Sequence, residues 1–285
     1  MTATSPPPAG PTGGYAFRDR PAHAAGSHHR LLDHLAEMLD PFTRRRLDPA
    51  LDRVAGSGGA RCLEVGAGAG TIAYWLANRV GASGEVVATD LDPSRIRAHP
   101  RITALAHDIV TDPLPGRFDL IHVRLVLAHL PERRQVLQHL VAALRPGGAL
   151  LVEEFDASWD RCILYSPDPD GHRLFTAYHH ALLAVLRSAG ADPGWGRAAH
   201  HALQRAGLVA VETELWSRSW CGGQAGCLLP HTAIGQLHDR LTAAGLSSGD
   251  LDRLRGLLLD PRLVVHGNTA VSTTGYRPDR PPGRP

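Results

Sequence analysis

The chain has 285 residues, 43% of them hydrophobic, which is enough for one well-buried domain and too few for three independent ones. Its 30 basic and 28 acidic residues leave a net charge of +2, so bulk charge indicates no nucleic-acid partner. All 30 basic residues are arginines, and the lack of lysine excludes Schiff-base catalysis and phosphate-binding P-loops, which both require that residue.

Cysteine and histidine spacing indicates neither a disulfide framework nor a metal site. The four cysteines form no C-x-x-C pair, and the 17 histidines include adjacent pairs but no H-E-x-x-H motif. Adjacent histidines on a helix point about 100° apart, so they chelate a metal poorly. The N-terminal residues lack the apolar core of a secretory signal, and no run of about 18 apolar residues occurs. We therefore expect a cytoplasmic protein with no metal, no membrane partner and no nucleic-acid partner.

The chain is expected to form a single domain, residues 15–277, between two flexible ends. Residues 1–14 and 278–285 are rich in proline and glycine and bury too little apolar surface to become ordered. Residues 27–47 carry leucines and a methionine at helical spacing, so they predict a helix that packs on the core or caps the site.

From residue 61 to residue 156, short apolar runs alternate with helical patterns. Strands are expected at 61–66, 85–90, 101–106, 118–123 and 149–155. Helices are expected to begin near residues 70, 93 and 131. Such alternation predicts a parallel sheet with right-handed crossovers, in which ligands bind at the carboxyl ends of the strands.

Beyond residue 156 the alternation stops. Helices are expected at 171–189, 196–206, 234–244 and 250–259. Strands are expected at 208–220 and, as the last element, at 263–275. The last two strands are not joined by a tight turn. We therefore expect the regions 157–206 and 230–260 to form a helical cap over a pocket.

The most informative segment runs from Glu64 to Thr71 and reads E-V-G-A-G-A-G-T, between the first strand and the first helix of the alternating region. Glycines there permit positive φ angles and let the backbone approach a ligand, while helix N-terminal amides face the loop. A loop of this kind alone also fits a dinucleotide site or a simple tight turn. However, a nicotinamide fingerprint requires its third glycine or alanine where this chain has Thr71.

Asp90 ends the second strand and can accept hydrogen bonds from both hydroxyls of a ribose. The alternative is that it caps a helix, because Pro93 and Ser94 follow. Asp92 takes the ribose role if the strand ends later.

Several motifs of this chain occur in the order found in class I methyltransferases. They are the E-x-G-x-G-x-G loop, the acid at position 90, the segment His107-Asp108-Ile109, and the later runs FDLIHVRLVLAHLP and ALRPGGALLVEEF. Over residues 60–156 the chain resembles this family, particularly the ubiquinone and menaquinone C-methyltransferases. The resemblance implies a Rossmann-like α/β fold, with a seven-stranded, mostly parallel sheet and helices on both faces.

The resemblance also implies S-adenosylmethionine as the cofactor. It implies that Glu64 helps to hold the loop and the cofactor's ammonium, that Asp108 accepts a hydrogen bond from the adenine amino group, and that Ile109 packs on the ring. Arg124 is expected to brace the cofactor or the loop, and Tyr15 to belong to a lid. The predicted cofactor-binding residues are Tyr15, Glu64, Gly66, Ala67, Gly68, Gly70, Thr71, Asp90, Leu91, Asp108, Ile109 and Arg124.

His129 and Asp156 are the candidates for a general base, because they follow the fourth and fifth strands at the edge where the methyl group should point. The alternatives are a packed histidine and a cap of the following segment. A base is optional, because positioning alone supplies much of the catalysis of methyl transfer.

The predicted function is transfer of a methyl group from S-adenosylmethionine to a small molecule, with an aromatic or natural-product metabolite as the favoured acceptor. An enzyme of this fold with cyclising chemistry, a nicotinamide-dependent oxidoreductase and a non-catalytic binding protein are the alternatives. A homodimer is left open.

Overall fold

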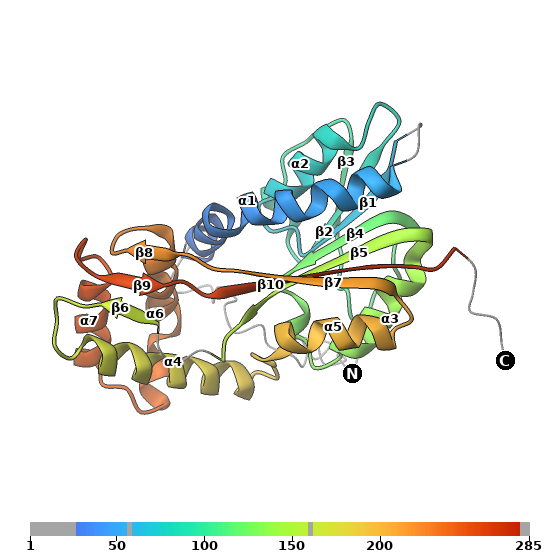
Figure 1. Ribbon diagram of the computed structural model, residues 1–285. Helices are drawn as coiled ribbons and strands as arrows, with labels where there is room; N and C mark the ends of the chain where they lie inside the picture. The colour runs from blue at the N-terminus through green and yellow to red at the C-terminus, as the bar shows by residue number, and fades with distance from the viewer. Residues whose placement is uncertain (1–26, 56–58, 159–161, 280–285) are drawn as a thin grey trace, which may run out of the picture.

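The structure is a computed structural model that describes residues 27–55, 59–158 and 162–279. Tyr15 and the predicted flexible N-terminus lie outside these residues. A seven-stranded sheet runs through the molecule (Figure 1). Its strands are β1 (Arg61–Val65), β2 (Glu85–Asp90), β3 (Ile102–Ala106), β4 (Phe118–Arg124), β5 (Leu144–Asp156), β7 (Val209–Trp216) and β10 (Thr269–Tyr276).

The strand order is β3-β2-β1-β4-β5-β10-β7, and only β10 is antiparallel to its neighbours. The predicted Rossmann-like, mostly parallel sheet of seven strands is thereby confirmed. The order reverses between β1 and β4, so the loops after these two strands flank the crevice where such sheets bind ligands.

Helices cover both faces of the sheet, with α1 and α2 on one face and α3 and α5 on the other (Figure 1). The helices are α1 (Ser27–Val54), α2 (Thr71–Arg79), α3 (Arg133–Ala143), α4 (Gly171–Ser188), α5 (Trp195–Arg205), α6 (Ala225–Ala243) and α7 (Ser248–Leu257). In α2 the buried residues Ile72, Ala73, Leu76 and Ala77 recur at helical spacing and form one stripe against the sheet.

The remaining elements form a lobe beyond one end of the sheet (Figure 1). Its small sheet contains β6 (Ile163–Tyr165), β8 (Ser219–Cys221) and β9 (Val264–His266), in the order β6-β9-β8. These strands share one apolar core with α4, α6, α7 and the first half of α1. The second half of α1 packs with α2 instead, so this helix joins the lobe to the central sheet.

Three local predictions were wrong. The segment 208–220 is not one strand, because residues 217–218 separate β7 from β8. Nor is the segment 263–275 one strand, because Gly267 and Asn268 separate β9 from β10. In each case the two strands belong to different sheets. No long helix begins at Pro93, where the structure has a three-residue 3₁₀ helix. Pro100 disfavours helical geometry at the residue before it, so the segment before β3 is too short for a full helix.

Candidate active site

The glycine-rich loop, residues 66–70, follows β1 and leads into α2. Three of its glycines have positive φ angles, 67° at Gly66, 54° at Gly68 and 78° at Gly70. Ala67 donates its N–H to the carbonyl of Thr89 in β2 at 2.9 Å, which ties the loop to the neighbouring strand. The first amides of α2, which begins at Thr71, face the same loop. Gly66 is exposed, Gly68 half-buried and Gly70 buried, so the accessible backbone of this loop at the carboxyl end of β1 is that of residues 66–69.

Asp90 is a half-buried residue that organises this loop. Its Oδ2 accepts the N–H of Gly68 at 2.8 Å, and its Oδ1 accepts the N–H of Asp92 at 3.0 Å. Each carboxylate oxygen keeps capacity for a further hydrogen bond, so Asp90 can still receive two hydroxyls. The strand ends at Asp90, as expected, and Asp92 instead caps the next turn by accepting the N–H of Ser94.

The residues predicted near the adenine lie at the ends of β2 and β3. Leu91 leaves 52% of its surface exposed beside Asp90. Asp108 is half-buried, and its Oδ1 accepts the N–H of Val110 at 2.9 Å. Ile109 is buried in the core beneath the sheet, so most of its surface is already covered.

A mainly apolar cavity of about 160 Å³ lies beyond the ends of β4 and β5, between the sheet and the lobe. Its walls come from α1, α4, α6 and the segments around residues 191–193 and 265–268. Apolar wall residues include Leu31, Leu35, Leu125, Phe155, Phe175, Leu182, Leu183, Leu186, Leu229 and Val265. The polar side chains among the lining residues are His129, Glu154, Tyr178, His179, Asp192, His266 and Asn268.

The glycine loop and this cavity share two walls. Leu32 in α1 lies 3.5 Å from the position that a Cβ at Gly68 would occupy, and its neighbour Leu31 lines the cavity. On the other side, the Val126 side chain lies against Gly66, and its neighbour Leu125 lines the cavity. A ligand on the loop therefore lies next to the cavity.

Leu125 has a φ of 55°, in the left-handed region that bulky residues rarely adopt. A residue held there costs of order 1–3 kcal/mol, and such strain is concentrated at functional sites. Its N–H donates to the carbonyl of Glu153 at 2.8 Å, which fixes this conformation at the junction of loop and cavity.

His129, one of the two base candidates, lies at the cavity. Burial and, to a smaller extent, the nearby positive charge of Arg133 together lower the pKa of its imidazole to about 4. The ring is therefore neutral at neutral pH, and protonating it is unfavourable.

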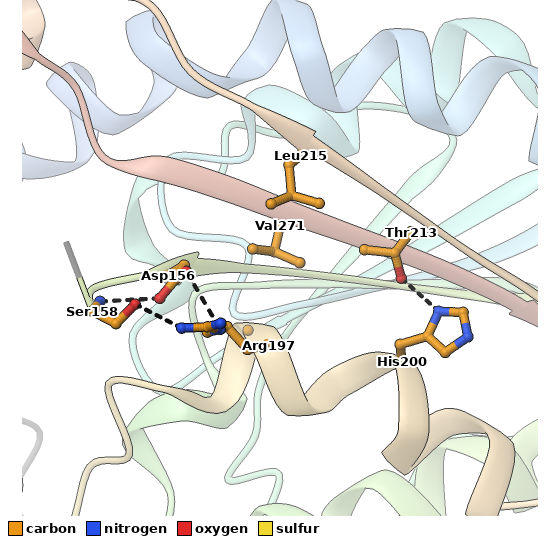
Figure 2. Close-up of a pocket in the computed structure, with 8 residues that line it drawn as sticks. Asp156, Ser158, Arg197, His200, Thr213, Leu215 and Val271 are labelled. Carbon is orange, nitrogen blue, oxygen red and sulfur yellow. Dashed lines mark hydrogen bonds and ion pairs between the residues drawn. The ribbon is translucent and has the colours of Figure 1, made fainter.

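Asp156, the other candidate, lies outside this cavity. It lines a separate hollow of about 430 Å³ between α5 and the strands β7 and β10 (Figure 2). Its Oδ1 accepts the N–H of Ser158 at 3.0 Å, and its Oδ2 lies 3.8 Å from Nε of Arg197. The structure thus does not bring the two candidate bases together.

Glu154 is a cavity residue that the sequence reasoning missed. Its side chain is buried, with 1% of the residue exposed. Its Oε1 accepts the N–H of Ala128 at 3.1 Å, and its Oε2 is buried with no hydrogen-bond partner among the described residues. Burial raises the pKa of this carboxyl to about 8, although the backbone N–H groups of residues 126–128 favour its anion.

A second missed feature is a buried chain of polar groups under α1. His122, fully buried in β4, donates from Nδ1 to Oε2 of Glu64 at 2.7 Å and from Nε2 to Oε2 of Glu153 at 3.4 Å. Thr43 of α1 also donates to Oε2 of Glu153. Burial opposes the charge on His122, but Glu64 and Glu153 raise its pKa to about 9, so the ring is an imidazolium between two carboxylates. Glu64 therefore contacts a residue of the neighbouring strand.

The guanidinium of Arg124 is directed towards α1. It donates to Oγ1 of Thr43 at 2.9 Å and to Oδ1 of Asp40 at 3.0 Å. Both of these partners belong to α1, so Arg124 ties the end of β4 to that helix.

Among the described residues, no cluster of three or more His, Cys, Asp and Glu side chains could hold a metal ion. Nor does any helix in the described ranges combine the length and apolar character needed to cross a bilayer.

Comparisons with known proteins agree with this arrangement. A methyltransferase domain family matches residues 27–213, which is more than half of the chain. Methyltransferase str2 of Strobilurus tenacellus is 32% identical over 137 residues, which cover 47% of this chain and 46% of that protein. The ubiquinone/menaquinone biosynthesis C-methyltransferase of Laribacter hongkongensis is 34% identical over 110 residues, covering 35% and 45%.

This chain aligns with less than half of the length of each of these two relatives. Among solved structures, the YcgJ protein of Bacillus subtilis has a TM-score of 0.50 at 13% identity, covering 83% of this chain and all of that one, which supports the fold alone. The family match includes the glycine loop, the acids Glu64, Asp90 and Asp108, and the strands that position them. The chain therefore belongs to the class I, S-adenosylmethionine-dependent methyltransferases.

Proposed function

We propose that this protein transfers the methyl group of S-adenosylmethionine to a small-molecule acceptor. The observation that carries the proposal is the adjacency of the glycine loop to a mainly apolar cavity, with shared walls at residues 31–32 and 125–126. One ligand on the loop and a second in the cavity would meet at that junction. When bound, the cofactor supplies a methyl group already activated on a sulfonium, so the protein's main task is positioning.

The loop residues fit this cofactor. Positive φ angles at Gly66, Gly68 and Gly70 leave backbone where side chains would otherwise fill the space. Asp90 has carboxylate capacity left for the ribose hydroxyls, and the exposed Leu91 beside it would cover one face of the adenine. Asp108 remains the proposed acceptor for the adenine amino group.

The remaining proposed roles follow from position. Thr71 would offer its hydroxyl as a donor at the end of the loop, and Ala67 would hold the loop in place, because its N–H donates to the carbonyl of Thr89. Glu64 would act on the cofactor indirectly, through the loop that follows it. Arg124 is proposed to position α1, which lies over the junction, because its hydrogen-bond partners Thr43 and Asp40 belong to that helix. A small molecule is the proposed partner, in preference to nucleic acid or a membrane, and a cytoplasmic location remains a prediction.

The test of the function has two stages. Purified protein is titrated with S-adenosylhomocysteine by calorimetry and then incubated with methyl-labelled S-adenosylmethionine and a panel of small phenols, enols and amines. Saturable binding, followed by transfer of label to a panel member, is expected. Product that is cyclised without gaining a methyl group would favour the cyclising alternative, and a folded protein that binds only a nicotinamide cofactor would overturn the proposal.

Replacing Asp90 by alanine is expected to weaken S-adenosylhomocysteine binding by about 1.5–3 kcal/mol, the usual value of hydrogen bonds to a charged group. The variant loses both the ribose contacts and the bond that orders the N–H of Gly68. Calorimetry of Asp92→Ala provides the matched comparison, because that carboxylate is exposed and caps the next turn by accepting the N–H of Ser94. An equal effect of the two substitutions would argue against ribose binding by Asp90.

A further inference from the structure

The chemistry of the cavity wall restricts what it can bind. No arginine is among the residues that line the cavity in the described parts of the chain, and the sequence contains no lysine. A carboxylate or phosphate placed there would lose its hydration without gaining a permanent positive partner, which is strongly unfavourable. The apolar walls instead favour an uncharged ligand.

Glu154 has a carboxyl oxygen on this wall that lacks a hydrogen-bond partner among the described residues. Its Oε2 is buried and without a hydrogen-bond partner among the described residues, while Oε1 is held by the N–H of Ala128. A buried polar atom without a partner costs free energy, so such an atom in a cavity indicates a ligand group that completes it.

Among the described residues that line the cavity, Oε2 of Glu154 is the one buried side-chain oxygen or nitrogen without a hydrogen-bond partner. By contrast, Nε2 of His179 donates to the carbonyl of Ala157 at 3.0 Å, and Oδ1 of Asp192 accepts the N–H of Gly194 at 3.0 Å. Protonation of His129 is opposed by burial and by the charge of Arg133.

Resting on the methyl transfer proposed above, we propose that Glu154 is the catalytic residue that takes the acceptor's proton, and that the acceptor is an uncharged, mainly apolar molecule with a reacting hydroxyl group. The hydroxyl oxygen of the acceptor forms the new bond to the methyl carbon. The carbon–sulfur bond breaks with its electron pair staying on sulfur, and the hydroxyl proton goes to the carboxylate of Glu154. The transfer thereby removes the positive charge from the sulfur and the negative charge from the carboxylate of Glu154.

The titration of Glu154 is matched to this task. A carboxyl with a pKa of about 8 holds a proton far more strongly than an ordinary glutamate, yet is partly ionised near neutral pH. The groups that act on it are the backbone N–H groups of residues 126–128 and Arg133 of α3, which favour its anion. The other titratable side chains of the cavity wall are His129, Tyr178, His179, Asp192 and His266. The rate should therefore rise with pH until the carboxyl is fully ionised.

The first measurement is the protonation state of Glu154 in protein saturated with S-adenosylhomocysteine. Difference infrared spectra between wild type and Glu154→Gln are expected to show a protonated carboxyl at pH 6 that is lost with a midpoint near pH 8. Glu212→Gln, an exposed position in β7, is the matched control and should show no such band. Because most of the wild-type carboxyl is protonated at pH 7, E154Q should unfold at an unchanged or higher temperature.

The second measurement uses 2-naphthol and 2-naphthoate as a matched pair of probes. In protein loaded with S-adenosylhomocysteine, 2-naphthol is expected to bind at pH 7 at least about tenfold more tightly than 2-naphthoate, and to shift the carboxyl band of Glu154. For any phenol that is methylated, E154Q is expected to lower kcat by about 100-fold or more and to abolish the rise of rate towards pH 8.

The outcomes separate the two proposals. Failure of S-adenosylhomocysteine to bind overturns both methyl transfer and the role of Glu154. Normal cofactor binding with equal or tighter binding of 2-naphthoate, or with no response of the carboxyl band to 2-naphthol, overturns only the present inference. If no probe is methylated, the binding preference and the infrared response decide the matter.

Discussion

Replacing His122 by glutamine is expected to lower the free energy of unfolding by about 3–5 kcal/mol at pH 6, the usual cost of breaking a buried ion pair by removing one partner. The imidazolium of His122 lies between the carboxylates of Glu64 and Glu153, with 0% of the histidine exposed. Glutamine can donate to only one of them at a time and carries no charge. Two buried carboxylates would then face each other without a cation between them.

The effect should depend on pH in a defined direction. The folded-state pKa of His122 is about 9 and its ordinary value is 6.5, so its stabilising contribution is complete below pH 6.5 and is lost as the pH rises through 9. The pKa of Glu153 is lowered instead, so its contribution is present above its ordinary value of 4.5 and is lost as the pH falls. The difference between wild type and H122Q should therefore be largest near pH 5–6.5.

Chemical denaturation at pH 6 and pH 9 measures this difference. The double variant H122Q/E153Q provides the control. Removing the carboxylate of Glu153 relieves its repulsion with Glu64, so the double variant should recover part of the stability that H122Q loses. Such non-additivity is expected when the two substituted side chains interact directly. A difference between wild type and H122Q that stays constant from pH 6 to pH 9 would contradict an imidazolium at this position.

The sheet could be predicted from the sequence more readily than the site, because strands and their loops depend on local sequence patterns. Runs such as Arg61–Val65 and Glu85–Asp90 are apolar and bounded by glycine and polar residues, and each became a strand at the expected place. The glycines of the first loop are equally local, because a positive φ is a property of single residues. The three-residue strands of the lobe are too short to produce a periodic signal.

The polar residues of the site were missed because their roles depend on cross-strand register. Glu64 lies opposite His122 only because β1 and β4 pair in one particular register. The adjacent acids Glu153 and Glu154 offered a signal, since two carboxylates in a buried strand must point to opposite faces. One joins the chain under α1 and the other lines the cavity, and alternation alone could have separated these two roles.

Replacing Gly66 by alanine is expected to weaken S-adenosylhomocysteine binding by about 2–4 kcal/mol, or about 30- to 700-fold. At a φ of 67° an alanine is strained, and its Cβ would overlap Cγ2 of Val126. The free loop can relax away from this conformation, so binding must restore it, and the cost should be observed as lost affinity.

Two further variants separate the strain from the overlap. Gly68→Ala has a comparable φ of 54°, but its Cβ would lie 3.5 Å from Leu32, an ordinary contact. Its loss of affinity should therefore be smaller than that of G66A. Adding Val126→Ala to G66A removes the overlapping methyl group, so calorimetry of the double variant should show affinity returning to that of G68A. Equal losses in G66A and G68A, with no recovery in the double variant, would mean that the loop is not held against the segment after β4, and that loop and cavity do not form one site.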